Sequence, residues 1–405
     1  VGQVGLADLC RDFLVQNAQR RGASEQREVA EVAEELAVLM RVGEDQVLHD
    51  EFHVDDAAAG GDHQDRTRLG GAQAPRVQLV STPELPDSEK LSWLVLGRSA
   101  VALFVNRRNP ATGLSRAQLV AACAASGVDY VDLCGEPAWM RQMIDAHEAA
   151  AKASGARIVF SCGFDSIPFD LGVWLLQDHM RRQFGAPAQR VRGRVRKMKG
   201  TFSGGTAASL KATLAAAIGD PGVMALLRNP FSLTPGFEGP APPPARKPMF
   251  DEVTGAWVAP FVMADINTRN VHRSNLLLGH AYGADFEYDE VVVAGSGNKG
   301  QAVAEAIAAD RSLGAEGGPQ PGEGPSRAER EAGHYDLLFI GDDRAGHRLK
   351  VSVTGDRDPG YGSTSKMISE CAICLLRDTP DVPAGFWTPG AAMQHKLDRK
   401  STRLN

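Results

Sequence analysis

The sequence predicts an α/β fold in which helices cover a parallel sheet, followed by a second domain of the α+β type. Between residues 115 and 185, segments with helical and with strand character alternate through short connections, which is the pattern of a parallel sheet. After Gly185, longer alternating strand patterns replace that order. The chain has 405 residues, which is enough for two domains.

The regular stretch contains three predicted helices and two predicted strands. The helices stop at Gly127, Gly155 and Gly185, and Pro137 opens the second one, as the preference for proline at helix starts and glycine after helix ends predicts. Sequential strands are usually neighbours, so we expect these two to pair through a right-handed crossover. The predicted segments are the helices 115–127, 137–155 and 169–185 and the strands 128–135 and 156–163.

The second half is predicted to be an α+β domain with long loops. We expect strands at 190–202, 256–264, 286–295, 334–341 and 347–355, and helices at 203–219, 266–278 and 362–378. The last two strands flank a short polar connection and predict a hairpin. The segments 236–248 and 313–326 are rich in proline and glycine and are expected to be loops.

The first hundred residues are less regular. The spacing predicts a helix at 24–41 and strands at 92–97 and 100–106. Between them, His49, His53 and His63 lie among several Asp residues. They fit either a metal site or a polar stretch without fixed geometry. No helical pattern frames the first two histidines, so the polar stretch is favoured and we predict no metal.

The composition excludes several classes of protein. The net charge of -6 and the pI near 6.0 argue against a nucleic-acid partner, because phosphate binding needs a concentrated basic surface. The sequence contains no run of about 18 apolar residues, so we expect no membrane-spanning helix. The N-terminal residues do not resemble a secretory signal. Six cysteines in a chain of this length predict reduced thiols rather than a disulfide framework. We therefore expect a cytoplasmic protein.

Two predicted strand ends are candidates for a ligand site. In a parallel sheet, ligands bind at the carboxyl ends of the strands. The segments DLCGE (132–136) and CGFDSIP (162–168) both leave a strand, pass through glycine and enter a helix, whose first N–H groups can receive a polar ligand. The alternative is structural, with Asp165 or Ser166 capping the helix and Pro168 in its first turn. Spacing alone favours the capped turn.

Three further motifs each allow a functional and a structural interpretation. The segment SGGT (203–206) fits a close approach of a ligand or a tight turn equally well. The segment GSGNKG (295–300) matches G-x-G-x-x-G. We reject it as a dinucleotide site, because no second strand ending in an acidic residue follows about 20 residues later. Cys371 and Cys374 lie in an apolar helical run without a partner pair, so we expect core cysteines.

A family resemblance extends this interpretation. The stretch GVDYVDLCGEPAWMRQMIDAHEAAAKASGARIVFSCGFDSIPFDLG resembles the second half of the nucleotide-binding domain in the saccharopine dehydrogenase-like oxidoreductases. The segments SGGTAASL, APFVMADINTRNVHRSN, DPGYGSTSKMISECAICLL and GFWTPGAAM are similar, in the same order, to the branch of trans-acting enoyl reductases. The resemblance covers roughly residues 113–395 and implies a partial Rossmann-like sheet with a second, mixed domain.

The resemblance also implies a reaction. A hydride from NADP or NAD, with NADPH favoured, goes to the β-carbon of an α,β-unsaturated acyl lipid or polyketide intermediate. The enolate oxygen is stabilised and a proton reaches the α-carbon. The substrate would be an acyl group or lipid bound to a carrier, and a homodimer and peripheral membrane association are further expectations. Two alternatives stay open: a non-catalytic remnant that no longer binds a dinucleotide, and a saccharopine-type amino-acid dehydrogenase.

The resemblance assigns roles to residues of this chain. The catalytic candidates are Asp165 and Tyr361, the latter as proton donor. Arg269, His272 and Arg273, at helical spacing, would contact an anionic carrier or else form a solvated basic face. The cofactor-binding residues would be Gly135, Glu136, Cys162, Gly163, Phe164, Asp165 and Ser166. Those that meet the substrate carbonyl would be Gly204, Gly205 and Thr206.

The chain departs from the family at its ends. The family's glycine-rich turn of the G-A-T-G-F-x-G kind is absent from residues 1–106, which we expect to be atypical. Either a misjoined or out-of-frame translation or a different domain would explain this segment. Residues 107–185 would form the second half of the nucleotide-binding domain. Residues 186–397 would form the substrate and dimerisation domain, whose C-terminal helix returns to the first domain. Residues 398–405 are expected to be a non-native tail.

Overall fold

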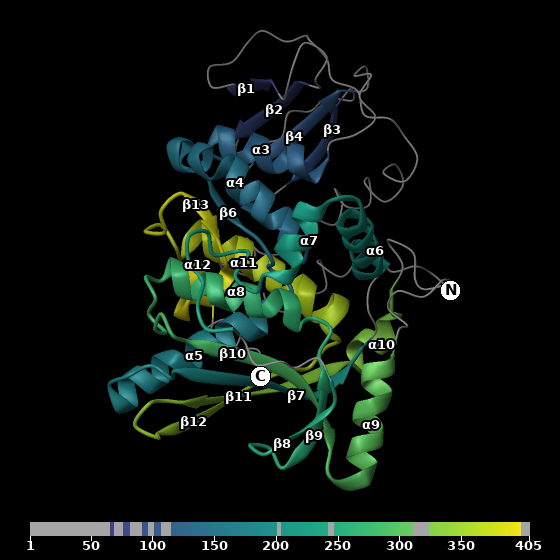
Figure 1. The fold of residues 1–405 in the computed structure, drawn as a ribbon. Helices are drawn as coiled ribbons and strands as arrows, with labels where there is room; N and C mark the ends of the chain where they lie inside the picture. The colour runs from purple at the N-terminus through teal and green to yellow at the C-terminus, as the bar shows by residue number, and fades with distance from the viewer. Residues whose placement is uncertain are drawn as a thin grey trace, which may run out of the picture. The chain divides into compact units, whose positions relative to one another are not determined.

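The computed structural model describes residues 115–200, 204–241, 247–310 and 324–397, and the backbone of four strands between residues 65 and 106 (Figure 1). The chain forms two compact units. The first comprises the described residues up to Tyr130, together with Met143–Ile158 and Ala372–Phe386, and the second comprises Val131–Gln142, Val159–Cys371 and the described residues from Trp387 onward.

The four N-terminal strands form an antiparallel sheet with the order β1-β2-β4-β3. Their bounds are Asp65–Arg68 (β1), Arg76–Ser81 (β2), Leu91–Val95 (β3) and Val101–Asn106 (β4). The strands predicted at 92–97 and 100–106 are confirmed. The helix predicted at 24–41, the three histidines of the polar stretch and the expected tail at 398–405 lie outside the described residues.

Helices α3 (Arg116–Ser126) and α4 (Pro137–Ser154) have the predicted boundaries. Ser115 Oγ accepts a hydrogen bond from Gln118 N at 3.2 Å and Gln118 Oε1 accepts one from Ser115 N at 2.8 Å, so a capping box starts α3. α3 ends at Gly127, whose φ is 71°. A Cβ there would lie 2.7 Å from the carbonyl oxygen of Ser154, so the turn needs glycine.

A parallel sheet of three strands has the order β13-β6-β5. The two predicted strands are confirmed as neighbours, but β5 (Tyr130–Val131) and β6 (Arg157–Val159) are shorter than predicted. The residues that follow them leave the sheet and build the site described below. The third strand, β13 (Gly385–Trp387), comes from the far end of the chain, and Gly385 N donates to Ala156 O at 2.8 Å.

The second unit contains a mixed sheet of six strands with the order β12-β11-β7-β10-β9-β8. Its central pair, β7 and β10, is parallel, and the other four pairs are antiparallel. The hairpin predicted from 334–355 is confirmed as β11 and β12. The strands are β7 (Arg190–Lys199), β8 (Met249–Asp251), β9 (Ala256–Pro260), β10 (Glu287–Gly295), β11 (His334–Asp342) and β12 (Arg348–Gly355).

Helices α5 (Ile167–Phe184), α8 (Ala264–Leu277) and α12 (Pro389–Met393) pack together beside this sheet (Figure 1). α5 contacts β11 and β12, and α8 contacts β10. Phe169 of α5 and Phe339 of β11 stack edge to face with their centroids 6.4 Å apart. A Cβ on Gly172 would lie 2.3 Å from Phe339 Cε2, so the close seat of α5 on β11 requires glycine.

The remaining elements surround this core. They are the helices α6 (Gly204–Gly219), α7 (Pro221–Arg228), α9 (Gly297–Ala309), α10 (Arg327–Glu331) and α11 (Thr364–Arg377), and the π-helical turn η2 (Pro359–Ser363). α9 packs against β9 and β10. Cys371 and Cys374 are fully buried in α11, which confirms them as core cysteines.

The G-x-G-x-x-G segment joins β10 to α9 in a tight turn. Gly295 and Gly297 have φ angles of 117° and 62°, which side chains rarely tolerate. A Cβ on Gly300 would lie 2.0 Å from Gly295 O. The local backbone therefore accounts for all three glycines. β10 also lies in the mixed sheet rather than in the parallel one, as expected when the motif is not a dinucleotide site.

Candidate functional site

The two predicted strand ends meet in the structure, and one carboxylate joins them. Asp132 Oδ1 accepts hydrogen bonds from Cys134 N at 2.9 Å and from Ser161 N at 3.2 Å. Cys162 N donates to Asp132 O at 2.7 Å, and Ser161 Oγ donates to Cys134 O at 2.6 Å. Asp132 is only 8% exposed. The DLCGE and SCGFDS segments are therefore one connected assembly at the carboxyl edge of β5 and β6.

Ser161 has an unusual backbone conformation in this assembly. Its φ is 62°, a left-handed value that costs free energy for any residue except glycine. Its N–H and hydroxyl groups are both bonded to the DLCGE segment, so neighbouring contacts hold the conformation. Strained residues of this kind cluster at ligand sites, which supports a functional interpretation of the turn.

The turn enters α5 through Gly163. Ser166 N and Ile167 N both donate to Gly163 O, at 3.2 and 2.9 Å. A Cβ on Gly163 would lie 3.0 Å from Leu133 Cδ2 and 3.2 Å from Thr364 Cγ2, so the close packing favours glycine. Phe164 N donates to Thr364 Oγ1 at 3.1 Å, which brings the first turn of α11 against this segment.

Asp165 and Ser166 differ in their surroundings. Asp165 keeps part of its surface exposed, and burial of the rest raises the pKa of its carboxyl to about 6. Ser166 occupies the N-cap position of α5, but its side chain makes no capping hydrogen bond. Its hydroxyl instead accepts from Asn270 Nδ2 at 2.7 Å. Capping by Ser166 is therefore wrong, because the tertiary contact with α8 takes its oxygen; Pro168 lies in the first turn as predicted.

Gly135 and Glu136 follow Cys134 in the DLCGE segment. Glu136 Oε2 accepts from Gly135 N at 3.2 Å and from Cys134 Sγ at 3.0 Å. Among the residues that the structure describes, apart from the two chain neighbours of Gly135, no heavy atom lies within 4 Å of the position that a Cβ on Gly135 would take. The backbone at Gly135 is thus open to the close approach of a flat or extended ligand.

Tyr361 lies in η2, directly before α11. Asp358 is fully buried and accepts from Tyr361 N at 2.9 Å and from Gly362 N at 2.7 Å. A Cβ on Gly324 would lie 2.3 Å from Tyr361 Cε2, so the backbone of residue 324 packs closely against the ring. Thr364, three residues further on, is the residue that bonds to Phe164, which links the Tyr361 segment to the Gly163 turn.

Arg269, His272 and Arg273 are buried in α8, with exposed fractions of 2%, 3% and 4%. The Arg269 guanidinium donates to the carbonyl oxygens of Leu227 and Asp265 at 2.6 Å and of Asn229 at 3.1 Å. Arg273 Nη1 donates to Leu233 O at 2.8 Å.

Burial also lowers the pKa of His272 to about 4, so this imidazole is neutral at physiological pH. The solvated basic face is therefore wrong, because the segment 227–233 covers these side chains. Contact with an anionic carrier stays a prediction.

Gly204 and Gly205 are the first residues of α6 rather than a separate turn before it. Thr206 is half-buried. Contact of these residues with a substrate carbonyl stays a prediction.

Sequence reasoning missed a buried polar cluster that fixes α5 against α8 and α12. Asp170 Oδ2 accepts from Ser274 Oγ and from Gly390 N, both at 2.8 Å, and Ser274 Oγ lies 2.6 Å from Thr388 Oγ1. Burial raises the pKa of Asp170 to about 7, against the two hydrogen bonds that lower it. The only sequence signal is that all four residues fall in segments that carry the family resemblance.

Across the described ranges, no cluster of three or more His, Cys, Asp or Glu side chains has the arrangement of a metal site. In the same part of the chain, no helix combines the length and the apolar character needed to cross a bilayer.

Comparison with known proteins gives clear relatives. A Mycobacterium tuberculosis protein named as a trans-acting enoyl reductase is 41% identical over 381 residues, and the match covers 84% of this chain and 89% of that protein. Trans-acting enoyl reductases of Mycobacterium ulcerans and Mycobacterium bovis are each 34% identical and cover 69% of this chain and 73% of their own length. The first match spans a larger share of the chain than residues 113–395 do. No protein-family model matches.

Among solved structures, a mutant of meso-DAP dehydrogenase from Clostridium tetani matches with a TM-score of 0.29 and 13% identity over 68% of this chain and 73% of that one. An amine dehydrogenase from Mycobacterium smegmatis matches with a TM-score of 0.29 and 14% identity over 67% of this chain and 70% of that one. Matches at this level leave the assignment to the sequence relatives.

Proposed function

The chain belongs to the family of trans-acting enoyl reductases, which are oxidoreductases, and from this premise we propose that it reduces the carbon–carbon double bond of an α,β-unsaturated acyl group. We propose a nicotinamide cofactor, with NADPH favoured over NADH. The observation that carries the proposal is the single assembly of the DLCGE and SCGFDS segments around Asp132. It lies where parallel sheets of this class bind their ligands.

The residues present fit the nicotinamide end of such a cofactor. Gly135 has open space in front of its backbone, and Gly163 presents a turn free of a side chain. We propose that Gly135, Glu136 and the segment 162–166 hold this end. When bound, the reduced cofactor supplies a hydride to the substrate β-carbon.

The second requirement is a proton for the α-carbon. With a pKa of about 6, most of the Asp165 carboxyl is ionised at neutral pH, so it accepts hydrogen bonds rather than donating a proton. We propose that Asp165 orients the cofactor and that Tyr361 is the proton donor. The Thr364–Phe164 hydrogen bond, which holds the Tyr361 segment at the turn, supports this division.

The test uses the full chain, NADPH and an enoyl thioester such as dodecenoyl-N-acetylcysteamine. We expect NADPH fluorescence to report binding, and addition of the thioester to oxidise the cofactor. With NADPH that carries deuterium at the transferred position, the deuterium should appear at the β-carbon of the product. Tyr361→Phe should lower kcat by about 10²-fold or more and leave NADPH binding unchanged. The exposed Arg182→Ala serves as a control, because its side chain is 72% exposed.

Two other outcomes decide the alternatives. No NADPH binding at millimolar concentration would favour a non-catalytic remnant. Cofactor oxidation or reduction with an amino-acid substrate, but not with the enoyl thioester, would favour a saccharopine-type dehydrogenase. A carrier-bound substrate, a homodimer and peripheral contact with a membrane in the cytoplasm stay predictions.

A further inference from the structure

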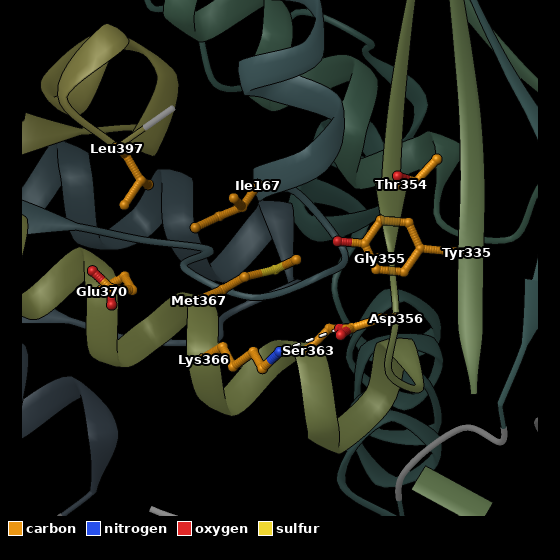
Figure 2. A pocket seen from close by; sticks show the side chains of 10 residues that line it. All are labelled: Ile167, Tyr335, Thr354, Gly355, Asp356, Ser363, Lys366, Met367, Glu370 and Leu397. Carbon is orange, nitrogen blue, oxygen red and sulfur yellow. Dashed lines mark hydrogen bonds and ion pairs between the residues drawn. The ribbon is translucent and has the colours of Figure 1, made fainter. Parts of the chain in front are cut away.

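A small cavity lies between α11, the start of α5 and the end of the β11–β12 hairpin. Its volume is about 70 Å³. Figure 2 shows Ile167, Met367 and Leu397 around it, with the hydroxyl of Tyr335 pointing toward the first two. Tyr335 and Leu397 are 6% and 2% exposed. Apolar side chains thus line much of the cavity, and polar groups come from Tyr335, Thr354, Ser363 and the buried Glu370.

The cavity shares its framework with the candidate site. Ile167 directly follows Ser166, and its N–H donates to Gly163 O at 2.9 Å. Met367 lies one turn after Thr364, whose hydroxyl accepts from Phe164 N. The Tyr335 ring packs on Phe164 with the centroids 4.8 Å apart. Elements that fix the Gly163–Ser166 turn thus also form the cavity walls.

One edge of the cavity is charged and reaches solvent. Lys366 Nζ lies 3.3 Å from Asp356 Oδ1 (Figure 2), and the two side chains are 22% and 64% exposed. This pair marks the solvent side, while Ile167, Met367 and Leu397 form the interior. The buried Glu370 carboxyl also lines the cavity, so an anionic ligand in the interior would lose its hydration beside another acidic group.

The size and chemistry of the cavity select its occupant. An apolar cavity of about 150 Å³ holds a molecule of the size of benzene, so a cavity of about 70 Å³ takes a shorter apolar segment. Methionine is flexible and can repack around chains of different shape, and Met367 is only partly buried. A short hydrocarbon segment fits the apolar side chains, whereas an anionic group would lie beside the Glu370 carboxyl.

We propose that this cavity binds an apolar segment of the acyl chain of the substrate, and that Met367 determines how much of the chain is accepted. This inference rests on the proposed function, because it takes the reacting double bond to lie at the adjoining turn. The apolar segment of the acyl chain replaces water in the cavity, and the contact favours long acyl groups over short ones.

The primary test measures binding without turnover. cis-Parinaric acid, a fluorescent fatty acid, is titrated into the full chain without cofactor, into Met367→Trp, and into the control Val303→Trp. Val303 lies in α9 and is 39% exposed, so a tryptophan there adds the same bulk away from the cavity. We expect binding to the wild type and to the control, and a loss on the order of tenfold in Met367→Trp, the effect of about two buried methylene groups.

A second measurement compares crotonyl and dodecenoyl thioesters as substrates. Met367→Trp should raise KM for the dodecenoyl thioester on the order of tenfold and leave the crotonyl thioester and NADPH binding unchanged. Met367→Leu, which conserves volume, should behave as the wild type, and circular dichroism checks that each variant is folded.

The outcomes separate the two proposals. Equal binding of parinaric acid to the wild type and Met367→Trp, or no binding to either, would overturn the cavity assignment even if the enoyl thioesters are reduced. Selective loss in Met367→Trp without any NADPH oxidation would support the cavity assignment and reject the proposed reaction. An equal effect of Met367→Trp on both thioesters would also overturn the assignment.

Discussion

Helix α8 and the turn between β6 and α5 both carry conspicuous polar residues, but the two regions differ in the burial of these residues and in the strain of the backbone. In α8, the ten residues Ile266–Asn275 are buried, and Arg269 and Arg273 donate to backbone carbonyls. At the turn, Asp165 keeps some exposure and Ser161 is held at a positive φ. The two arginines of α8, which donate to carbonyl oxygens inside the protein, indicate a scaffold, whereas strain, partial exposure and open backbone indicate a place for a ligand.

The largest effect should come from removing a scaffold charge. Arg269→Leu leaves the carbonyl oxygens of Leu227 and Asn229 without this donor in a buried place. We expect it to lower the free energy of unfolding by about 3–5 kcal/mol, measured by urea denaturation. Arg182→Ala, at a surface ion pair, should change it by less than about 1 kcal/mol. If Arg269→Leu lowers the free energy of unfolding as little as the control does, Arg269 does not stabilise the scaffold.

Asp132 should show how far the turn depends on its clamp. Asp132→Ala removes the acceptor shared by Cys134 N and Ser161 N, and we expect a loss of about 1–3 kcal/mol in unfolding free energy. NADPH affinity should fall as well, because the two strand ends separate. Asp132→Asn keeps an oxygen acceptor and should retain most of both. Unchanged NADPH affinity in a folded Asp132→Ala would show that the cofactor does not depend on this clamp.

The buried carboxyl of Asp170 predicts a pH dependence of stability. Its pKa is about 7 in the folded chain, above the ordinary aspartate value of about 4, so the folded state binds more protons than the unfolded state between these values. Stability from this group is therefore present at low pH and is lost as pH rises from about 4 to about 7, at up to about 1.4 kcal/mol per pH unit.

Asp170→Asn should flatten this slope in urea titrations across that pH range. It should not abolish the slope, because Glu290, whose burial raises its pKa to about 8, acts with the same sign. A slope identical to that of the wild type would mean that Asp170 does not change its protonation over this range.

The smallest effect isolates the strain at Ser161. Ser161→Ala and Ser161→Gly both remove the hydroxyl bond to Cys134 O, which is worth about 1 kcal/mol. Only glycine relieves the positive φ, by about 1 kcal/mol. We expect the glycine variant to unfold at a higher urea concentration than the alanine variant. If the two unfold together, the φ of 62° stores no free energy and the contrast with α8 weakens.

Local features of the chain were predictable from the sequence. The capping box at Ser115, the glycines after helices and Pro137 act within a few residues, so the boundaries of α3 and α4 followed from them. The alternation in 334–355 likewise predicted the β11–β12 hairpin. The meeting of the two strand ends followed from the general topology of parallel sheets.

Long-range contacts were not predictable in the same way. Helical spacing groups Arg269, His272 and Arg273 but does not say what covers them, and the segment 227–233 does so from about 40 residues away in sequence. Ser166 fits an N-cap by residue type, yet Asn270 takes its hydroxyl. The third strand of the parallel sheet, β13, begins at Gly385, whose N–H donates to the carbonyl oxygen of Ala156. No local sequence pattern indicates this pairing.

The seat of α5 on the sheet has a consequence for how the chain can vary. Gly172 touches the Phe339 ring so closely that a methyl group at position 172 would overlap it, with Cβ 2.3 Å from Cε2. Gly172 lies one and a half turns beyond Ser166, and the height of the helix on the sheet also sets the height of its first turn. Positions 172 and 339 should therefore covary among homologues. A residue larger than glycine at position 172 is expected only where the residue at position 339 is smaller than phenylalanine. A change at either one alone would shift the floor of the site without altering any residue that touches a ligand.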